Sequence, residues 1–97
     1  MATLLSAVTA NGAGSGASHS GPCTVWVRGT LGGATVSIQG ADADSDANYV
    51  KLDKSIIRND KFEAKGCATV DAQGTYYLRA VVSNAGSSTS VTVVTTQ

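Results

Sequence analysis

Apolar and polar residues alternate in short runs along most of the 97-residue chain. In CTVWVRG at 23–29 and in ATVSIQG at 34–40, every second residue is apolar. A period of two is typical of an antiparallel strand with one buried face. Because only a few residues around Leu-Gly-Gly separate the two runs, we expect them to form a hairpin.

The same pattern predicts further strands at 3–9, in YVKL and CATV, and in TYYLRAVVSN and TSVTVVTT. Within TYYLRAVVSN, Tyr76 and Leu78 belong to one face, and Tyr77 and Arg79 to the other. The less regular segment KSIIRNDKFEAKG supplies apolar residues around an RND turn. About seven or eight short strands separated by turn residues indicate an all-β fold, an antiparallel β-sandwich or a small barrel.

The N-terminal part of the chain differs from the rest in its composition and in its pattern of apolar residues. Its start, MATLLSAVTANGA, has no basic region and an interrupted apolar run, so we interpret it as a retained strand rather than a secretory signal. The Gly- and Ser-rich NGAGSGASHSGP follows and is typical of a flexible arm or loop. We therefore expect residues 1–21 to form a strand and an arm, and residues 22–97 to form the sandwich domain.

Composition narrows the class of protein. Gly, Ala, Ser, Thr and Val dominate, which favours strands and turns over helices. Seven basic and seven acidic residues cancel, so nothing in the net charge points to nucleic acid or to an anionic membrane as a partner. No apolar run approaches the roughly 20 residues that span a bilayer, so we expect a soluble protein made in a cytoplasm.

Cys23 and Cys67 are too few for a disulfide-rich scaffold and lack metal-ligand spacing. We expect two buried free thiols, with a disulfide as the alternative if two strands bring them together.

Candidate chemistry is concentrated in GADADSDANYVKLD. Asp42, Asp44, Asp46 and Asp53 have the spacing of positions one, three, five and twelve of a calcium loop. However, Ala47 replaces the glycine of the sharp turn, and Asp53 is shorter than the usual Glu. Because Asp also favours turns through side-chain to backbone bonds, we expect a hydrated loop between strands and no cofactor, with calcium as the weaker alternative.

No segment predicts catalysis. His19 is the only histidine and lies in the Gly/Ser-rich segment, where we expect it to be exposed. No nucleophile motif surrounds any serine, and Gly-Ala-Gly-Ser-Gly lacks both a lysine and a following helix, so we expect no enzyme.

The side chains opposite the aliphatic faces are candidates for an interface. Trp26 and Arg28 share one side of their strand, and Tyr77 and Arg79 share one side of theirs. Trp, Tyr and Arg are enriched at the energetic centres of protein interfaces. The alternative is that one of these faces belongs to the core, with Trp26 inside it.

The run DAQGTYYLRAVVSNAGSSTSVTVV resembles the E–F corner, F strand, F–G turn and G strand of immunoglobulin-like domains. The resemblance implies that Asp71, Gly74 and Tyr76 form a tyrosine corner, with the Tyr76 hydroxyl bonded to upstream backbone. Leu78 stands where antibody domains carry the second cysteine, which implies an immunoglobulin-like sandwich without that disulfide.

The segments TLLSAVTANGAGSG and VWVRGTLGGATVSIQGADADSDANYVKLD resemble small β-rich accessory virion proteins of tailed bacteriophages. This resemblance implies a capsid decoration or cement protein that stabilises the head through subunit contacts. Implied partners are the major capsid protein or other virion proteins and further copies of the chain, as a trimer, with the segment from Ala2 to Ser20 as an arm ordered by neighbours. The alternatives are a tail, neck or head-fibre component, or an immunoglobulin-like adhesion module that binds host-surface glycans.

Overall fold

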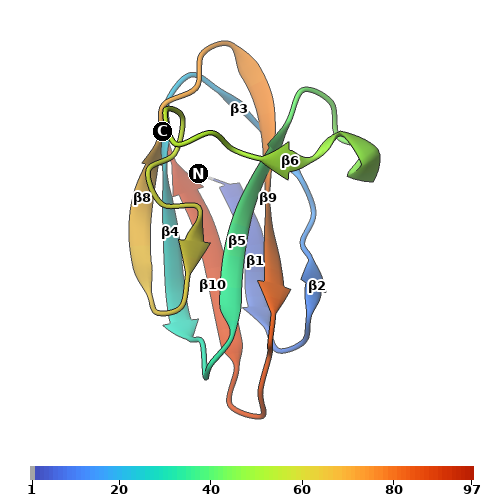
Figure 1. Ribbon diagram of the computed structural model, residues 1–97, viewed down its shortest axis with the longest axis vertical. Coiled ribbons are helices and arrows are strands. Elements are labelled where there is room, and N and C mark those ends of the chain that lie inside the picture. Colours follow the sequence, from blue (N-terminus) through green and yellow to red (C-terminus); the bar gives the residue numbers. More distant parts are fainter. Residues whose placement is uncertain (1) are drawn as a thin grey trace.

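The alternating segments form two antiparallel sheets that pack face to face in residues 2–97, the part of the chain that the computed structural model describes (Figure 1). Sheet A has the order β1-β10-β4-β8, with bounds β1 (Ala2–Val8), β4 (Cys23–Thr30), β8 (Gly66–Val70) and β10 (Ser90–Thr96). Sheet B contains β2 (Gly12–Ala13), β3 (Ala17–Ser20), β5 (Thr35–Ala41), β6 (Val50–Lys51), β7 (Lys61–Phe62) and β9 (Thr75–Ser83). The all-β antiparallel sandwich is confirmed.

Sheet B has two long central strands, β5 and β9, and each of its two edge positions is occupied by two short strands. β2 and β3 pair with successive parts of β9, and β6 and β7 pair with successive parts of β5. Each sheet therefore has four strand positions. A single turn of 3-10 helix, η1 (Asp46–Asn48), interrupts the loop between β5 and β6. No helix in residues 2–97 has the length and apolar character needed to cross a membrane.

The chain changes sheet at nearly every connection. When β2 with β3, and β6 with β7, are each counted as one broken strand, only the link from β5 to β6 stays within a sheet. This strand order and crossover pattern are those of a jelly roll, a double-sheet sandwich of eight strands. In an immunoglobulin-like domain the last two strands are neighbours in one sheet. Here β9 lies in sheet B and β10 in sheet A, so the implied F–G pairing is absent.

The expected hairpin between CTVWVRG and ATVSIQG is wrong for the same reason. These segments are β4 and β5, which lie in opposite sheets. The turn between them closes with the N–H of Ala34 donating to the carbonyl of Leu31 at 3.0 Å. Both of these residues are buried, and Gly32 and Gly33 supply φ angles of +60° and +88°. The two apolar faces meet across the interior instead of lying side by side.

The core lies between the sheets and is formed by the inward residues that the alternation predicts. Fully buried members include Val25 and Val27 of β4, Val36 and Ile38 of β5, Leu78 and Ala80 of β9, and Val91 and Val93 of β10. Ile57 and Phe62 from the irregular segment are also buried.

The N-terminal segment is part of the sandwich, which corrects the expected division at residue 21. β1 pairs with β10 and buries Leu4 and Leu5, while β2 and β3 pair with β9. Each long strand thereby gains a hydrogen-bonded neighbour. The Gly/Ser-rich residues thus lie along sheet B and do not project as an arm.

Candidate functional site

The four aspartates of the candidate calcium loop serve separate contacts. Asp53 follows β6 and accepts the backbone N–H of Ser55 at 2.9 Å, and hydrogen bonding from Ser55 lowers the pKa of the Asp53 carboxyl. Asp42 lines a pocket described below, and Asp44 and Asp46 contact other side chains. Within residues 2–97 no three His, Cys, Asp or Glu side chains are grouped so that they could hold a metal ion. The regular spacing in the sequence does not bring the carboxylates to one centre.

Arg79 anchors the aspartate loop to the outer face of sheet B. Its guanidinium donates to Gln39 Oε1 through Nε and to Asp46 Oδ1 through Nη1, both at 2.8 Å. Its Cζ lies 4.3 Å from the centroid of the Tyr49 ring. The Tyr49 hydroxyl donates to Asp44 Oδ1 at 2.8 Å, and burial together with this contact raises the pKa of Tyr49 to about 12. Arg79, proposed for an interface, is thus engaged within its own chain.

The structure separates the two pairs of interface candidates. Trp26 and Arg28 extend from β4 on the outer face of sheet A, whereas Tyr77 and Arg79 extend from β9 on the outer face of sheet B. They cannot form one surface, because the sandwich lies between them. The alternative with Trp26 in the core is wrong, since 43% of this residue is exposed.

Trp26 is anchored to sheet A by a hydrogen bond to β10. Its indole N–H donates to Thr96 Oγ1 at 3.0 Å. Its cross-strand partners are Val94 on β10 and Cys67 on β8. Val94 is only 4% exposed although it lies on the outer face, so the surface around Trp26 is packed.

An open, mainly apolar pocket of about 350 Å³ lies at the other corner of the molecule, beside the aspartate loop. Val50, Leu52 and Ile56 form its apolar wall, and Asp42 is the charged residue among those that line it. Leu52 packs closely over Gly40, where a Cβ atom would clash with it. The pattern in YVKL predicted an ordinary strand and did not indicate this pocket; only Val50 and Lys51 of the segment form a strand, and Leu52 turns to the pocket wall.

The expectation of an exposed His19 is wrong. The residue is 3% exposed, because it occupies an inward position of β3. Its Nε2 lies 2.6 Å from Thr95 Oγ1 and its Nδ1 lies 3.0 Å from the carbonyl oxygen of Ala17. The ring stacks on Tyr76, and burial lowers the pKa of His19. The ring therefore links sheet B to sheet A through a threonine hydroxyl.

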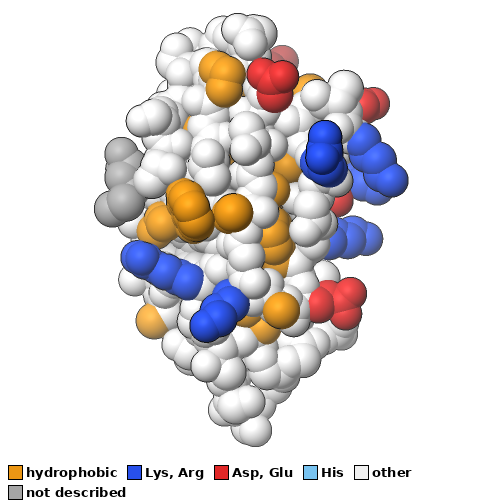
Figure 2. Space-filling model, turned by 90° about the vertical axis from the view of Figure 1, so that its left-hand side faces the viewer, with side chains coloured by type: hydrophobic (Ala, Val, Ile, Leu, Met, Phe, Trp, Pro, Cys, Tyr) orange, Lys and Arg blue, Asp and Glu red, His pale blue; other side chains and the backbone are white. Residues whose placement is uncertain are grey.

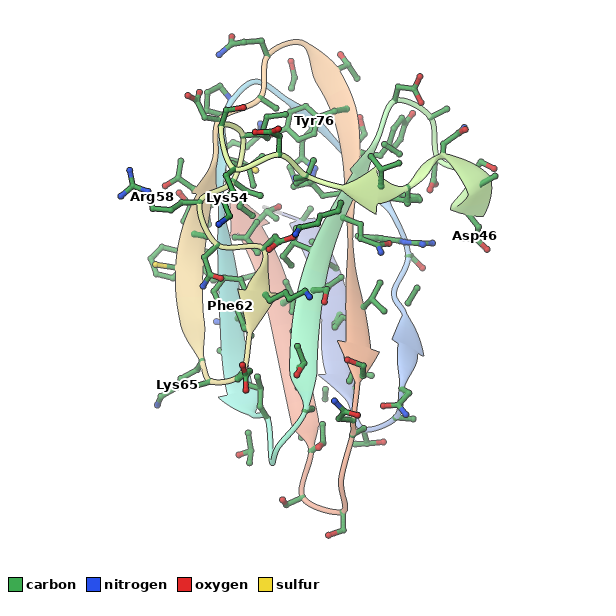
Figure 3. All side chains as sticks on the ribbon, viewed as in Figure 1. Asp46, Lys54, Arg58, Phe62, Lys65 and Tyr76 are labelled. Carbon is green, nitrogen blue, oxygen red and sulfur yellow. The ribbon has the colours of Figure 1, made fainter. Side chains whose placement is uncertain are left out.

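Tyr76 is buried, and its hydroxyl donates to upstream backbone, but not at the corner that the resemblance implied. The acceptor is the carbonyl of Gly21 at 2.6 Å, on the segment before β4. In a tyrosine corner the acceptor lies only a few residues upstream. Figure 3 shows Tyr76 at the upper end of the sandwich, and the same hydroxyl contacts Cys23 Sγ at 3.4 Å.

The two thiols are free, but only Cys23 is buried. Cys67 is exposed, because it lies in register with Trp26 on the outer face of sheet A. Burial raises the pKa of the Cys23 thiol.

The described residues thus offer two surfaces for recognition, the face around Trp26 and the pocket beside Asp42. Comparisons of the chain with models of protein families, with curated proteins and with solved structures found no match.

Proposed function

We propose that this chain is an accessory structural protein of a bacteriophage virion, a capsid decoration or cement protein that stabilises the head through subunit contacts. The observation that carries the proposal is the exposure of Trp26, 43%, on the outer face of sheet A, where Thr96 holds its indole. Large aromatic side chains held in a fixed orientation at a surface contribute strongly to protein interfaces at a low entropic cost.

The fold is compatible with this role. Jelly rolls occur in viral capsid domains and in lectins, so the architecture admits the proposal without selecting it. The two free thiols suit a protein that folds in a reducing cytoplasm without a disulfide.

The mechanism we propose is multivalent. Each copy contributes a small contact to a neighbouring subunit, and many copies together oppose separation of the shell. A contact through Trp26 suits this mechanism because its indole is already positioned by Thr96 before binding.

The test is to purify virus particles made from the genome that encodes the chain and to locate the chain by mass spectrometry and by a particle map. We expect repeated copies on the head. Trp26→Ala is expected to lower the number of bound copies at least tenfold. Tyr77→Ala, which alters an aromatic residue on the opposite face, is the matched control and is expected to bind normally. Purified particles without the chain would refute the proposal.

A ligand-binding module is the second candidate, favoured by the pocket of about 350 Å³. Its polar lining residues, Asp42, Asn48 and Thr75, could orient a small ligand or a glycan. Melting curves with and without millimolar calcium, and with a panel of glycans, separate the two functions. A rise of several degrees in melting temperature would favour the binding module, and unchanged curves the structural role.

A further inference from the structure

We propose that copies of this chain associate head to tail, with the tryptophan face of one copy docked on the Asp42 pocket of the next. The tryptophan face comprises Trp26, Arg28, Cys67 and Val94, and the Asp42 pocket comprises Asp42, Val50, Leu52 and Ile56. The inference deepens the proposed structural function, on which it rests, by naming the partner as a second copy.

The tryptophan face combines an apolar centre with positive charge. Arg28 extends from the same side of β4 as Trp26. Arg58 lines a shallow depression together with Cys67, the cross-strand partner of Trp26. Figure 2 views this side of the molecule and shows hydrophobic side chains in its middle, with Lys and Arg side chains on both sides of them and Asp and Glu side chains along one side and the top.

The Asp42 pocket has the complementary character. Its wall is aliphatic, and Val50 at its rim is 60% exposed. Asp42 places a carboxylate among the lining residues, and the aspartate loop continues from it. Figure 3 shows Asp46 of this loop on one side of the molecule and Arg58 and Lys65 on the other. Arg28 of the tryptophan face and Asp42 of the pocket carry opposite charges.

Trp26 and Val50 are the exposed large hydrophobic residues within 2–97, and each belongs to one of these two surfaces. A single head-to-tail contact removes both from water and brings Arg28 toward Asp42. The open shape of the pocket suits an indole whose N–H is already bonded to Thr96 of its own chain.

The charges also argue against a two-fold contact. Two tryptophan faces placed together would bring cationic side chains toward cationic ones, and two pockets would oppose their carboxylates. Because the tryptophan face and the pocket are different surfaces, each copy can use both at once. Such a heterologous contact closes into a ring, including the trimer expected from the sequence, or continues as a filament.

The test uses two single variants at exposed positions, Trp26→Ser and Val50→Ser, each checked for an unchanged β-sheet spectrum and cooperative melting. Sedimentation equilibrium of the unmodified chain is expected to show oligomers that grow with protein concentration and weaken as salt is added. Each variant alone is expected to be monomeric. Their equimolar mixture is expected to form dimers and nothing larger, because each mixed pair retains one intact face and one intact pocket.

Charge reversal provides a second test. Arg28→Asp and Asp42→Arg are each expected to weaken association at least tenfold, and the double variant is expected to recover it. Alkylation of Cys67 gives a separate readout, since this exposed thiol borders Trp26 and is expected to react more slowly in the oligomer.

An unmodified chain that stays monomeric at its highest attainable concentration would overturn the inference. So would a variant mixture that remains monomeric, or a loss of association with Trp26→Ser but not with Val50→Ser, which indicates a two-fold contact. The two proposals fail separately. Oligomers in solution without incorporation into particles refute only the virion role, whereas incorporated copies that do not associate refute only the head-to-tail contact.

Discussion

At the scale of single residues, His19 forms a buried contact between the two sheets. Its imidazole lies against Thr95 and stacks on Tyr76, where a positive charge would be poorly solvated. From the sequence we expected His19 to be exposed in a flexible segment, because glycine and serine surround it. The useful signal was the short alternation in ASHS, which directs one side chain of four inward.

His19 is expected to make stability depend on pH. Burial lowers its folded pKa below the unfolded value of about 6.5, so the unfolded chain binds the proton more readily. The corresponding stability is fully present above about pH 6.5 and is lost as the pH falls toward the lower folded pKa. Melting temperatures measured between pH 7.5 and pH 5 should therefore decrease. His19→Gln should be less stable at neutral pH and should show a flatter profile; an equal slope in both proteins would contradict this role.

Gly16 is a second residue with a specific steric role. A Cβ atom at this position would collide with the Tyr49 hydroxyl and with Asp44 Oδ1. Gly16→Ala is therefore expected to displace the Tyr49 and Asp44 side chains, which lie at the surface and can move, and to cost about 1 kcal/mol of unfolding free energy or less. Urea denaturation measures the loss.

The Tyr49→Ala background is the control for this prediction. Removing the tyrosine ring and hydroxyl relieves most of the collision, so Gly16→Ala should cost less in that background. Equal costs in the two backgrounds would show that Gly16 does not act through Tyr49.

At the scale of elements, alternation predicted which residues of each strand face the core but not which strands are neighbours. Val25, Val36 and Leu78 are inward as expected. The pairing of β4 with β5 and of β9 with β10 was misjudged, because a turn of a few residues can join strands within a sheet or across the interior. Periodicity indicates which face of a strand is buried. That face can be buried equally well when the next strand lies beside it in the same sheet and when it lies in the opposite sheet.

Thr89 connects the turn between β9 and β10 to the turn between β4 and β5 at one end of the sandwich. Its hydroxyl donates to the Leu31 carbonyl at 2.7 Å and accepts the N–H of Gly86 at 2.9 Å. Thr89→Val would remove both bonds and leave the Gly86 N–H without this partner, whereas the Leu31 carbonyl keeps the N–H of Ala34, so we expect a cost of about 1 kcal/mol. Thr69→Val, at an exposed position of β8, is the matched control, with an expected effect within about 0.5 kcal/mol. Equal stability of the two variants in urea denaturation would rule out this role for Thr89.

At the scale of the whole molecule, the N-terminal strands are structural. A chain of residues 22–97 would lack β1 to β3 and with them the buried Leu4, Leu5 and His19. We expect this fragment to show no cooperative thermal transition and poor dispersion of its amide NMR signals. A cooperative transition would restore the division at residue 21 that the composition predicted.

The candidate sites were predicted in part, because residue type indicates which side chains suit an interface but not which contacts the folded chain gives them. Residue type identified Trp26 and Arg28 as surface candidates, and the structure exposes Trp26. The same rule selected Arg79, which instead pairs with Asp46 from a loop 33 residues away. The pocket of Val50, Leu52 and Ile56 depends on how that loop returns past the end of the sheet, which no local pattern specifies.

The place of the last strand has a consequence for how the protein is made. β10 lies between β1 and β4, and Ala2 pairs with Thr95, so sheet A lacks this central strand until residues 90–96 have been made. Contacts so distant in sequence form slowly, because the intervening chain must be ordered first. Only a chain that includes β10 can close the sheet that carries Trp26. Chains that stop before β10 are therefore expected to lack the docking surface.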